Sequence, residues 1–579
     1  MRVLFLPLLI ATTLTTGPAT AADGSSAPLA IGAVQGSGDG SPLEGQTVIV
    51  EGVVTADLRE GLGGFFLQDA GDGNAETSDG IFVMHAFDAV VDGEIVRVGQ
   101  RVRIEGKVVE TEVGRQGTRL TAISPSHIEA VAEAAPLIAT AELKAIPANW
   151  ESLEGMKVRI SAPLTVAGTD QLDRYGELSV AFDGRLWQPS EVAAPGSPAF
   201  QQVVTDNKRR RLLLDDGSGD RDPKSISYLT GEHAPRAGTA LDGVEGIVDE
   251  RHGGYRLQTS SPLKLKDPQR PTPPTVPGTL KIAAFNLENL FNGDGRGGGF
   301  PTSRGAKTPQ QLQAQTVKLV ATIHGLNPDI AALMELENDG YGPESSLTQF
   351  VAALNADGGD WRFIDAGQGP GPDTIRVGLI YRASRVTPQG KPAVLEDGPF
   401  GERSRVPLAQ AFMPIGEDRL PVVVVANHFK SKGCSEATGA DADQNDGQGC
   451  WNALRLDASK RLDAWIKTDP TGSRSDMTVL LGDFNAYAME DPMRWLRQSG
   501  WVDAFVAAKV EHPYSYVYNG LSGRLDHALL SPALAKKIRG AAEWHINADE
   551  SEREGYAESG STTPYRSSDH DPLLLGFDL

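Results

Sequence analysis

The chain has 579 residues, of which 40% are hydrophobic and 22% are charged. This composition is typical of globular protein and excludes a disordered chain or a coiled coil as the main structure. The formal net charge of −22 excludes a protein that holds nucleic acid by overall positive charge, because such affinity comes from neutralising phosphates. Any binding of a polyanion must therefore be local or assisted by a metal ion.

The first residues of the chain predict a secretory signal. Arg2 precedes an apolar run that reaches about Leu14, and small residues stand at Ala19 and Ala21. This pattern is typical of a signal peptide, here residues 1–21, cleaved after Ala21. No later stretch approaches the roughly 18 uninterrupted apolar residues that a membrane helix requires. We therefore expect a secreted or periplasmic protein that does not bind a membrane.

Short alternating strands and glycine turns dominate the N-terminal half and predict all-β structure. We expect a small barrel over residues 28–135 and a second β domain over residues 136–266. The segment SPLEGQTVIVEGVV at Ser41 is echoed by ESLEGMKVRISAPL at Glu151, which indicates a tandem repeat, with convergent β composition as the alternative. The paired VxVxGxV strands resemble the OB-fold, so the first barrel is expected to be OB-like and the second is a candidate for the same fold.

A proline-rich segment over residues 267–279 separates this half from the rest, and it predicts an extended linker because proline blocks regular hydrogen bonding. Residues 280–579 then alternate strands with helices. The strands are continuous apolar runs, such as VVVVANHF and TVLLGDFN, which indicates burial on both faces in a layered α/β domain. A basic run at 208–211 would suit phosphate contacts, although such runs are more often solvated loops.

Polar motifs end several apolar runs of this domain. In chain order they are FNLEN at Asn286, LMELEN at Glu335, ANHFKSK at His428, GDFN at Asp483 and Asn485, LDH at Asp526, and SSDHDP at Asp569 and His570. Residues that follow buried strands are expected to meet at one edge of a sheet. Phosphodiester hydrolysis needs a cation, a base and an acid, and these residue types supply all three requirements.

In this order, the motifs resemble those of the endonuclease/exonuclease/phosphatase superfamily over about residues 281–579. The whole chain is similar to secreted bacterial deoxyribonucleases in which an OB-like module precedes the catalytic domain. The resemblance implies that the catalytic domain is an α/β four-layer sandwich with a DNase-like fold.

The resemblance also implies roles for the motif residues. Glu335 is expected to be the principal ligand of Mg²⁺ or Mn²⁺, assisted by Asn286 and Asp569, because oxygen donors suit a hard divalent ion better than zinc. Glu337 is an alternative ligand, and a solvated strand-end glutamate is the alternative interpretation.

The remaining motif residues are expected to handle the water, the phosphate and the leaving group. His570, paired with Asp526, would act as the general base. Asp483 and Asn485 would orient the phosphate and stabilise its developing charge. His428 would act as the general acid towards the leaving oxygen.

One position departs from the family pattern. The family pairs this second histidine with an acid just before the strand VGLIYR, where this chain has Ile375 or Arg376. Asp373 is the nearest carboxylate, and we expect it to pair with His428 in a shifted register. Further phosphate contacts are expected from four basic residues near the motifs, each of which could equally be an exposed charge: Arg304, Lys430, Lys432 and Arg455.

The only two cysteines, Cys434 and Cys450, are expected to form a disulfide, since the chain carries an export signal; reduced cysteines are the alternative. The turn between them is rich in oxygen ligands and is similar to a Ca²⁺ loop, with Asp441, Asp443, Asn445 and Asp446. Its glycine is one place late and Asn452 stands at position twelve, so a polar surface turn is favoured over a Ca²⁺ site.

These observations predict a secreted, divalent-metal-dependent endonuclease that cleaves extracellular DNA, with RNA as a further substrate. One alternative is a phosphoesterase of the same superfamily that acts on phospholipid or nucleotide phosphodiesters. Another is a nucleic-acid-binding protein with a degenerate enzyme domain. No protein partner is predicted.

Overall fold

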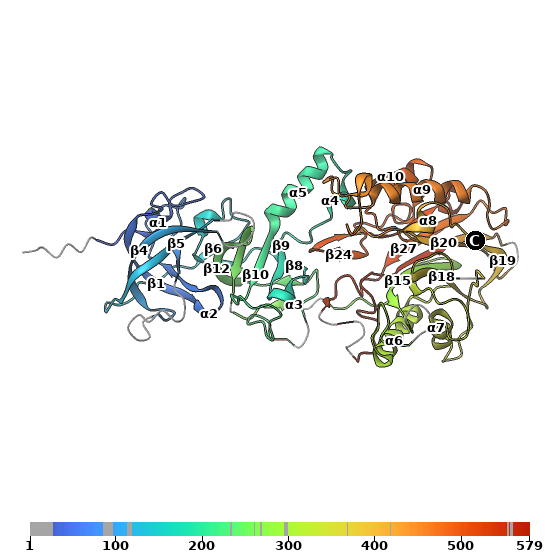
Figure 1. The fold of residues 1–579 in the computed structure, drawn as a ribbon, viewed down its shortest axis with the longest axis horizontal. Coiled ribbons are helices and arrows are strands. Elements are labelled where there is room, and N and C mark those ends of the chain that lie inside the picture. Colours follow the sequence, from blue (N-terminus) through green and yellow to red (C-terminus); the bar gives the residue numbers. More distant parts are fainter. Residues whose placement is uncertain are drawn as a thin grey trace, which may run out of the picture.

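The computed structural model describes residues 27–84, 96–112, 119–231, 234–259, 261–266, 269–293, 299–367, 369–416, 419–552, 555 and 560–579. The expected signal peptide lies outside these residues. Among the residues described, no helix is both long and apolar enough to span a membrane. Three bodies follow one another in an elongated row: a barrel, a second β unit and a larger α/β domain (Figure 1).

The N-terminal body is a closed barrel with the strand order β1-β2-β3-β5-β4. Strand β3 runs parallel to β5, and the other neighbours are antiparallel. Alternating apolar residues such as Val48, Val50, Ile104 and Ile123 fill the interior, as the period of a strand requires. The elements are α1 Ile31–Gln35, β1 Thr47–Leu58, α2 Arg59–Leu62, β2 Gly64–Gln68, β3 Gly80–Met84, β4 Arg101–Glu112 and β5 Arg119–Ala130.

The second β unit is a nine-stranded sheet with the order β14-β11-β8-β9-β10-β13-β12-β7-β6. Its strands are β6 Ala141–Leu143, β7 Lys157–Ile160, β8 Leu164–Gly168, β9 Leu178–Phe182, β10 Arg211–Asp215, β11 Ala240–Leu241, β12 Val244–Arg251, β13 Gly254–Gln258 and β14 Leu265–Lys266. Its helices are η1 Glu151–Leu153, α3 Leu172–Tyr175, α4 Pro189–Val192 and α5 Pro198–Arg210.

The second unit repeats the strand pairing of the first barrel. Strand β8 pairs with β9, β9 with β10, β10 runs parallel to β13, β13 pairs with β12, and β12 pairs with β7. Strands β7 and β8 together therefore stand where β1 stands in the first barrel. The two segments that echo one another in sequence, at Ser41 and Glu151, lead into these equivalent strands.

The C-terminal domain contains two six-stranded sheets, with the orders β17-β18-β16-β15-β28-β27 and β19-β20-β21-β22-β26-β23. The first consists of β15 Leu280–Leu290, β16 Ile330–Glu337, β17 Trp361–Phe363, β18 Ile375–Arg382, β27 Ile538–Glu543 and β28 Leu573–Phe577. The second consists of β19 Val386–Val394, β20 Arg405–Pro414, β21 Val422–His428, β22 Thr478–Asp483, β23 Val502–Asp503 and β26 Asp526–Leu530. A separate hairpin is formed by β24 Tyr516–Tyr518 and β25 Leu521–Gly523.

The two sheets pack face to face, and helices cover their outer faces (Figure 1). Ile282 and Met334 of the first sheet share one buried cluster with Val424 and Leu481 of the second. Helices α6 Pro309–Leu326 and α7 Ser346–Leu354 bury apolar residues against the first sheet. Helices α9 Asn452–Ile466 and α10 Asp491–Gln498, with the short α8 Pro399–Glu402, do the same on the second sheet. The remaining helices are η2 Gly439–Asp441, α11 Ala504–Ala507 and α12 Pro532–Ala535.

Two parallel strand pairs bring the polar motifs to one edge of the domain. β15 runs parallel to β16, and β21 runs parallel to β22, so the motifs at their carboxyl ends meet. The β15–β16 register shifts between Asn286 and Leu290, and Glu335 has a φ of 64°. A bulge of this kind redirects a side chain out of the strand's alternation. The side chain of Glu335 therefore does not follow the alternation of inward and outward side chains along β16.

The second β unit is joined to the C-terminal domain by buried ionic contacts. Arg524 Nε lies 2.9 Å from Glu191 Oε1, and Arg524 Nη1 lies 3.1 Å from Asp503 Oδ2. The Ser190 hydroxyl donates to Glu490 Oε1 at 2.9 Å. All five side chains are buried or nearly so. These buried ion pairs, in which each charge is compensated by its partner, therefore fix the orientation of the two bodies.

The proline-rich segment packs along the C-terminal domain. Residues 269–279 contain no helix or strand, as the prolines predict. Trp544 Nε1 donates to the Pro271 carbonyl at 2.8 Å, Arg270 Nη2 lies 2.8 Å from Glu550 Oε2, and Val276 is buried. The segment is extended, and the contacts hold it against the domain that follows.

Substitution of Arg524 by Met should destabilise the full chain by about 3–5 kcal/mol, because Glu191 and Asp503 would keep buried charges without their cation. A thermal or urea denaturation series measures this loss. Arg461→Met is the matched control, since Arg461 pairs with Asp457 and Asp397 on the surface. Equal losses in the two variants would contradict the role given to Arg524.

Candidate active site

Four of the six polar motifs line one cavity of about 410 Å³ at the edge where the parallel strands end, through Glu335, His428, Asp483 with Asn485, and His570. Asp569 lines a separate pocket. The two sheets contribute opposite walls, with Glu335 from the first and His428 and Asp483 from the second. The lining is rich in charged side chains of both signs. It consists of Arg304, Glu335, Pro372, Asp373, Glu402, Arg403, Ser404, Arg405, His428, Lys430, Ser431, Asp483, Asn485 and His570.

His570 and Asp526 form a buried pair, as the sequence predicts. His570 Nδ1 lies 2.6 Å from Asp526 Oδ2, and the Ser515 hydroxyl donates to the same oxygen at 2.8 Å. Burial by itself lowers the pKa of His570, but the charges of Asp526, Asp569 and Asp483 together raise that pKa well above its usual value. The bond to Asp526 also fixes the ring, so that the other nitrogen, Nε2, is the one left for chemistry.

Asp483 and Asn485 lie together beside this pair. The Asn485 amide N–H donates to Asp483 Oδ1 at 2.8 Å, and Asn286 Nδ2 donates to Asp483 Oδ2 at 3.3 Å. Burial raises the pKa of Asp483 to about 7; the charge of His570 lowers it and that of Asp526 raises it. Asn485 has a φ of 48°, a left-handed conformation that asparagine tolerates better than most residues. The carboxyl group and the amide are thus held in fixed positions.

Carboxylates gather on the side of the first sheet, where Arg405 and Arg566 offset part of their charge. Burial raises the pKa of Glu335, and the neighbouring charge of Asp569 raises it further. Burial and Asp569 likewise raise the pKa of Glu288 to about 8, although Arg566 Nη1 lies 2.9 Å from its Oε2 and opposes the rise. Oxygen donors with an excess of negative charge are the ligands that a hard divalent cation prefers. Glu335, Asp569 and the side-chain oxygen of Asn286 are donors of this type.

Glu337, the alternative ligand, has a structural role. Its Oε2 accepts hydrogen bonds from the backbone amides of Asn292 at 2.8 Å and Gly293 at 3.1 Å, and the side chain is fully buried. The carboxylate thus anchors the loop that follows β15. Glu335, in contrast, lines the cavity.

The expected pairing of Asp373 with His428 is wrong. Asp373 Oδ2 lies 3.1 Å from Arg405 Nε, and Arg405 Nη1 in turn lies 3.4 Å from His428 Nε2. A guanidinium therefore occupies the place expected for an acid. His428 Nε2 also lies 3.4 Å from Asp483 Oδ2. Burial lowers the pKa of His428 well below its usual value, and the charge of Arg405 lowers it further, so that this imidazole is neutral at pH 7.

The four basic residues expected to contact phosphate divide into two pairs. Arg304 and Lys430 line the cavity. Lys432 and Arg455 do not. Lys432 Nζ bonds both oxygens of the buried Glu490, at 2.7 and 2.6 Å, and Arg455 is fully buried and donates to the carbonyls of Cys450 at 2.8 Å and Gln448 at 3.0 Å. The prediction of phosphate contacts is therefore wrong for Lys432 and Arg455, which support the cavity wall from behind.

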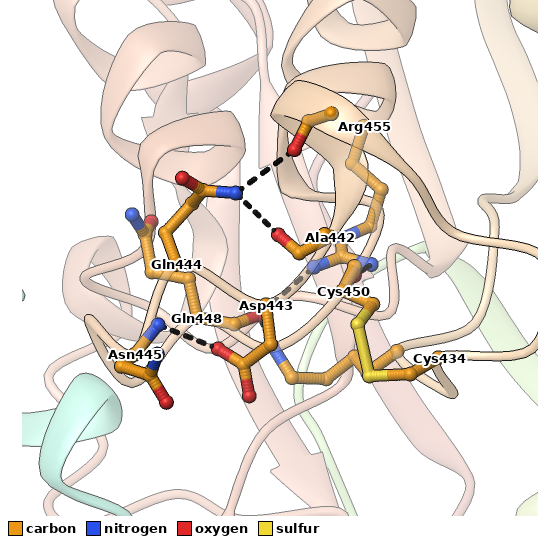
Figure 2. Close-up of a disulfide and its surroundings, with 10 residues drawn as sticks. Cys434, Ala442, Asp443, Gln444, Asn445, Gln448, Cys450 and Arg455 are labelled. Atoms are coloured by element: carbon orange, nitrogen blue, oxygen red, sulfur yellow. Dashed lines mark hydrogen bonds between the residues drawn. A yellow bond between two sulfur atoms is a disulfide. The ribbon is translucent and has the colours of Figure 1, made fainter.

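The predicted disulfide between Cys434 and Cys450 is confirmed (Figure 2). It ties the loop after β21 to the start of α9, next to Arg455. The carboxylates of the oxygen-rich turn between the cysteines accept hydrogen bonds from the turn's own backbone. Asp443 Oδ1 accepts from the Asn445 amide (Figure 2), and Asp446 Oδ1 accepts from the Gln448 amide. Among the described residues, the turn holds no group of three convergent acidic, histidine or cysteine ligands, which agrees with a polar surface turn.

A chain of contacts connects the second β unit with the catalytic pair. Arg185 Nη2 bonds Asp549 Oδ2 at 2.7 Å, and Tyr514 OH bonds the same oxygen at 3.0 Å. The Tyr514 ring stacks on His545 with centroids 3.8 Å apart, and His545 Nδ1 lies 2.9 Å from Asp571 Oδ2. Asp571 directly follows His570, so residues of the second β unit support the backbone that positions this histidine.

Sequence reasoning missed Arg403, Arg405, Glu288 and Ser515. Arg405 begins β20, a strand that carries no motif, and Arg403 directly follows α8, so only the fold brings them to the cavity. Glu288 belongs to the FNLEN motif, so its sequence position offered a signal. Ser515 gave none, because it lies in the sequence PYSYVY, which reads as a surface turn.

The charged cavity between two packed sheets, with a His–Asp pair and strand-end carboxylates, is that of a phosphoester hydrolase. Residues 283–570 match the model of the endonuclease/exonuclease/phosphatase family. This part of the chain belongs to that family, whose members are hydrolases that act on phosphodiesters. Residues 144–267 match a family described as a domain of unknown function, DUF8508. Among curated proteins, no sequence matches the chain.

Solved structures similar to the chain include humanized D. rerio TDP2, with 17% identity over 51% of this chain and 97% of that chain, at a TM-score of 0.33. The human Nocturnin catalytic domain with bound sulfate has 15% identity, covering 51% and 92% of the two chains, at a TM-score of 0.33. The mannosyl-6-phosphatase Bt3783 of Bacteroides thetaiotaomicron has 10% identity, covering 51% and 98%, at a TM-score of 0.32.

Lys430→Met and Lys432→Met should affect different properties, the first the KM and the second the stability of the chain. Lys432→Met should destabilise the chain by about 3 kcal/mol, because Glu490 would lose the cation that touches both of its oxygens, while the KM of the remaining folded enzyme stays near that of the wild type. Lys430→Met should leave stability unchanged and raise the KM for a phosphodiester roughly tenfold. Thermal melts and steady-state kinetics measure both effects. A raised KM in Lys432→Met with normal stability would contradict this assignment.

Proposed function

We propose that the protein is a divalent-metal-dependent endonuclease that hydrolyses phosphodiester bonds of DNA, and of RNA as a second substrate. The observation that carries the proposal is that three groups converge in one cavity. They are the His570–Asp526 pair, the fixed Asp483 and Asn485, and the basic lining residues Arg304, Arg403, Arg405 and Lys430. A degenerate enzyme domain would be expected to lack one or more of these groups.

Glu335 and Asp569 would hold the cation, with the Asn286 amide beside them. When bound, a divalent cation shields the phosphate charge and stabilises the negative charge that develops during hydrolysis. Magnesium or manganese suits a site whose protein ligands are one or two carboxylates. The charge of Asp569 contributes to the raised pKa values of Glu335 and Glu288, and such a cation would relieve this repulsion.

The side chains of the protein divide the remaining work. His570 Nε2, with Nδ1 held by Asp526, would accept a proton from the attacking water as general base. Because the neighbouring carboxylates raise the pKa of His570, only the neutral fraction of the ring would act, and a bound cation that offsets the charge of Asp569 would enlarge that fraction. Asp483 and Asn485 would fix the phosphate, the latter through its amide. Arg405 would stabilise the phosphate next to the neutral His428, whose N–H would serve as a hydrogen-bond donor. Arg304 and Lys430 would neutralise the flanking phosphates.

Two further features of the fold belong to this proposal. The closed order of the first barrel, with its parallel β3–β5 pair, supports an OB-like fold, and the second β unit shares that pairing. Two helix layers around two packed sheets support the four-layer sandwich expected for the catalytic domain. A disulfide favours an oxidising compartment, which together with the sequence of residues 1–21 supports export to the periplasm or the medium.

The test is nicking of supercoiled plasmid by the full chain with Mg²⁺ or Mn²⁺. A chelator should abolish nicking, and His570→Ala should reduce the rate by about 10²–10⁴ through loss of the base. His127→Ala, which removes an exposed histidine of the first barrel, is the matched control and should leave the rate unchanged. Full activity in His570→Ala would disprove the mechanism.

The same preparation separates the alternatives. Plasmid, sphingomyelin and bis(p-nitrophenyl) phosphate are offered in parallel at equal enzyme concentration. Hydrolysis of sphingomyelin with intact plasmid would replace the nuclease by a phospholipid phosphoesterase. Plasmid binding without hydrolysis of any substrate would indicate a nucleic-acid-binding protein.

A further inference from the structure

Three glutamates meet where the first barrel contacts the second β unit, at a distance in sequence from every motif discussed so far. Glu151 lies in η1, Glu154 directly follows that helix, and Glu250 lies in β12. Each offers one carboxylate oxygen, and these oxygens all lie within 4.8 Å of one another. Glu151 is 8% exposed and Glu154 is 0% exposed. The cluster is thus a buried concentration of like charge.

Two carboxylates of the first barrel, Asp39 and Glu110, add to the negative charge around this cluster. The charges of Asp39 and Glu110 raise the pKa of Glu151, after burial itself, and burial followed by Glu151 and Asp39 raises the pKa of Glu250 to about 7. No lysine or arginine in the described part of the chain forms an ion pair with any of these five carboxylates.

One of the carboxylates also lacks hydrogen bonds that its burial requires. Glu154 Oε1 accepts from Gln35 Nε2 at 3.4 Å and from the Thr121 amide at 3.2 Å, but the buried Glu154 Oε2 has no partner. Glu110 Oε2 is a second buried oxygen without a partner. An unpartnered carboxylate oxygen in a protein interior is costly, and a cation is the ligand that satisfies it.

We propose that Glu151, Glu154 and Glu250 bind one calcium ion at the junction of the two β units. The donors are oxygens only, which favours a hard cation. Oxygens that bind one Ca²⁺ at 2.3–2.6 Å are at most roughly 5 Å apart, and these three oxygens lie within that limit. Ca²⁺ also accepts an irregular set of carboxylates, whereas Mg²⁺ demands a near-ideal octahedron and keeps several waters. Glu154 is tied to the first barrel through Gln35 and Thr121, so the ion fixes the orientation of one β unit on the other.

The site carries its own spectroscopic probe. Tyr255 OH donates to Glu151 Oε2 at 2.6 Å, and the Trp150 ring stacks on Tyr255 with centroids 6.2 Å apart. Terbium(III), a luminescent substitute for calcium, should be sensitised by these rings when it binds to the chelator-treated full chain. Calcium should displace it, and Trp150→Phe should weaken the signal.

The decisive comparison is a calcium titration of thermal stability. In the wild type, calcium at roughly 100 times its Kd should raise the Tm by about 5 °C, and an equal concentration of Mg²⁺ should raise it less. Glu154→Gln/Glu250→Gln should be at least as stable as the wild type without calcium, because repulsion is relieved, and should lose both the calcium shift and the terbium signal. Glu250→Gln alone, at a half-buried position, serves if the double variant does not fold.

Two control variants separate this site from the candidate active site. Glu335→Gln should keep the calcium shift, since Glu335 lies in the other domain. Glu105→Gln, which removes an exposed glutamate from the same strand as Glu110, should also keep it. A shift of equal size in the double variant and the wild type, or no calcium shift in the wild type, would overturn the proposal. Either result leaves the proposed nuclease function untouched.

Discussion

Burial of carboxylates beside one another is the constraint on which this structure depends. Like charges in a medium of low polarity raise one another's pKa values, and the group must either take up protons or find a cation. Where the second β unit meets the catalytic domain, Arg524 supplies that cation to Glu191 and Asp503. Around Glu335 and Asp569 the chain supplies too little positive charge of its own. The carboxylates of the candidate active site are thus left without full charge compensation, which a bound cation would supply.

Much of the catalytic side was visible in the sequence because its signals are local. Apolar runs ending in polar motifs predicted strands whose ends meet. The family resemblance of these motifs predicted the pairing of His570 with Asp526, and the two cysteines behind an export signal predicted the disulfide. Contacts between segments that carry no motif have no local sequence signal and could not be predicted in this way. Arg405 displaced the expected acid because β20 pairs with β21 at this edge, a matter of register that no local pattern encodes. Lys432 and Arg455 could not be distinguished from surface cations, since burial is a property of the packed chain.

The second β unit contributes to the catalytic domain more than a proline-rich connection would suggest. It neutralises a buried charge through Glu191, and through Arg185 it supports the segment that carries His570. The segment between the two bodies also packs on the C-terminal domain through Pro271 and Val276. The two bodies thus behave as one structural unit, and the first barrel is attached to it through a different, acidic surface.

The order of strands in the first sheet has a consequence for biosynthesis. The strand that opens the C-terminal domain, β15, pairs with β28, which is formed by some of the last residues described, and His570 lies just before β28. This contact joins parts of the chain almost three hundred residues apart, and such pairing forms late because a long loop must close first. The paired His570 and Asp526 therefore cannot reach their folded positions while the chain is still being made. The candidate active site is complete only after synthesis has passed β28.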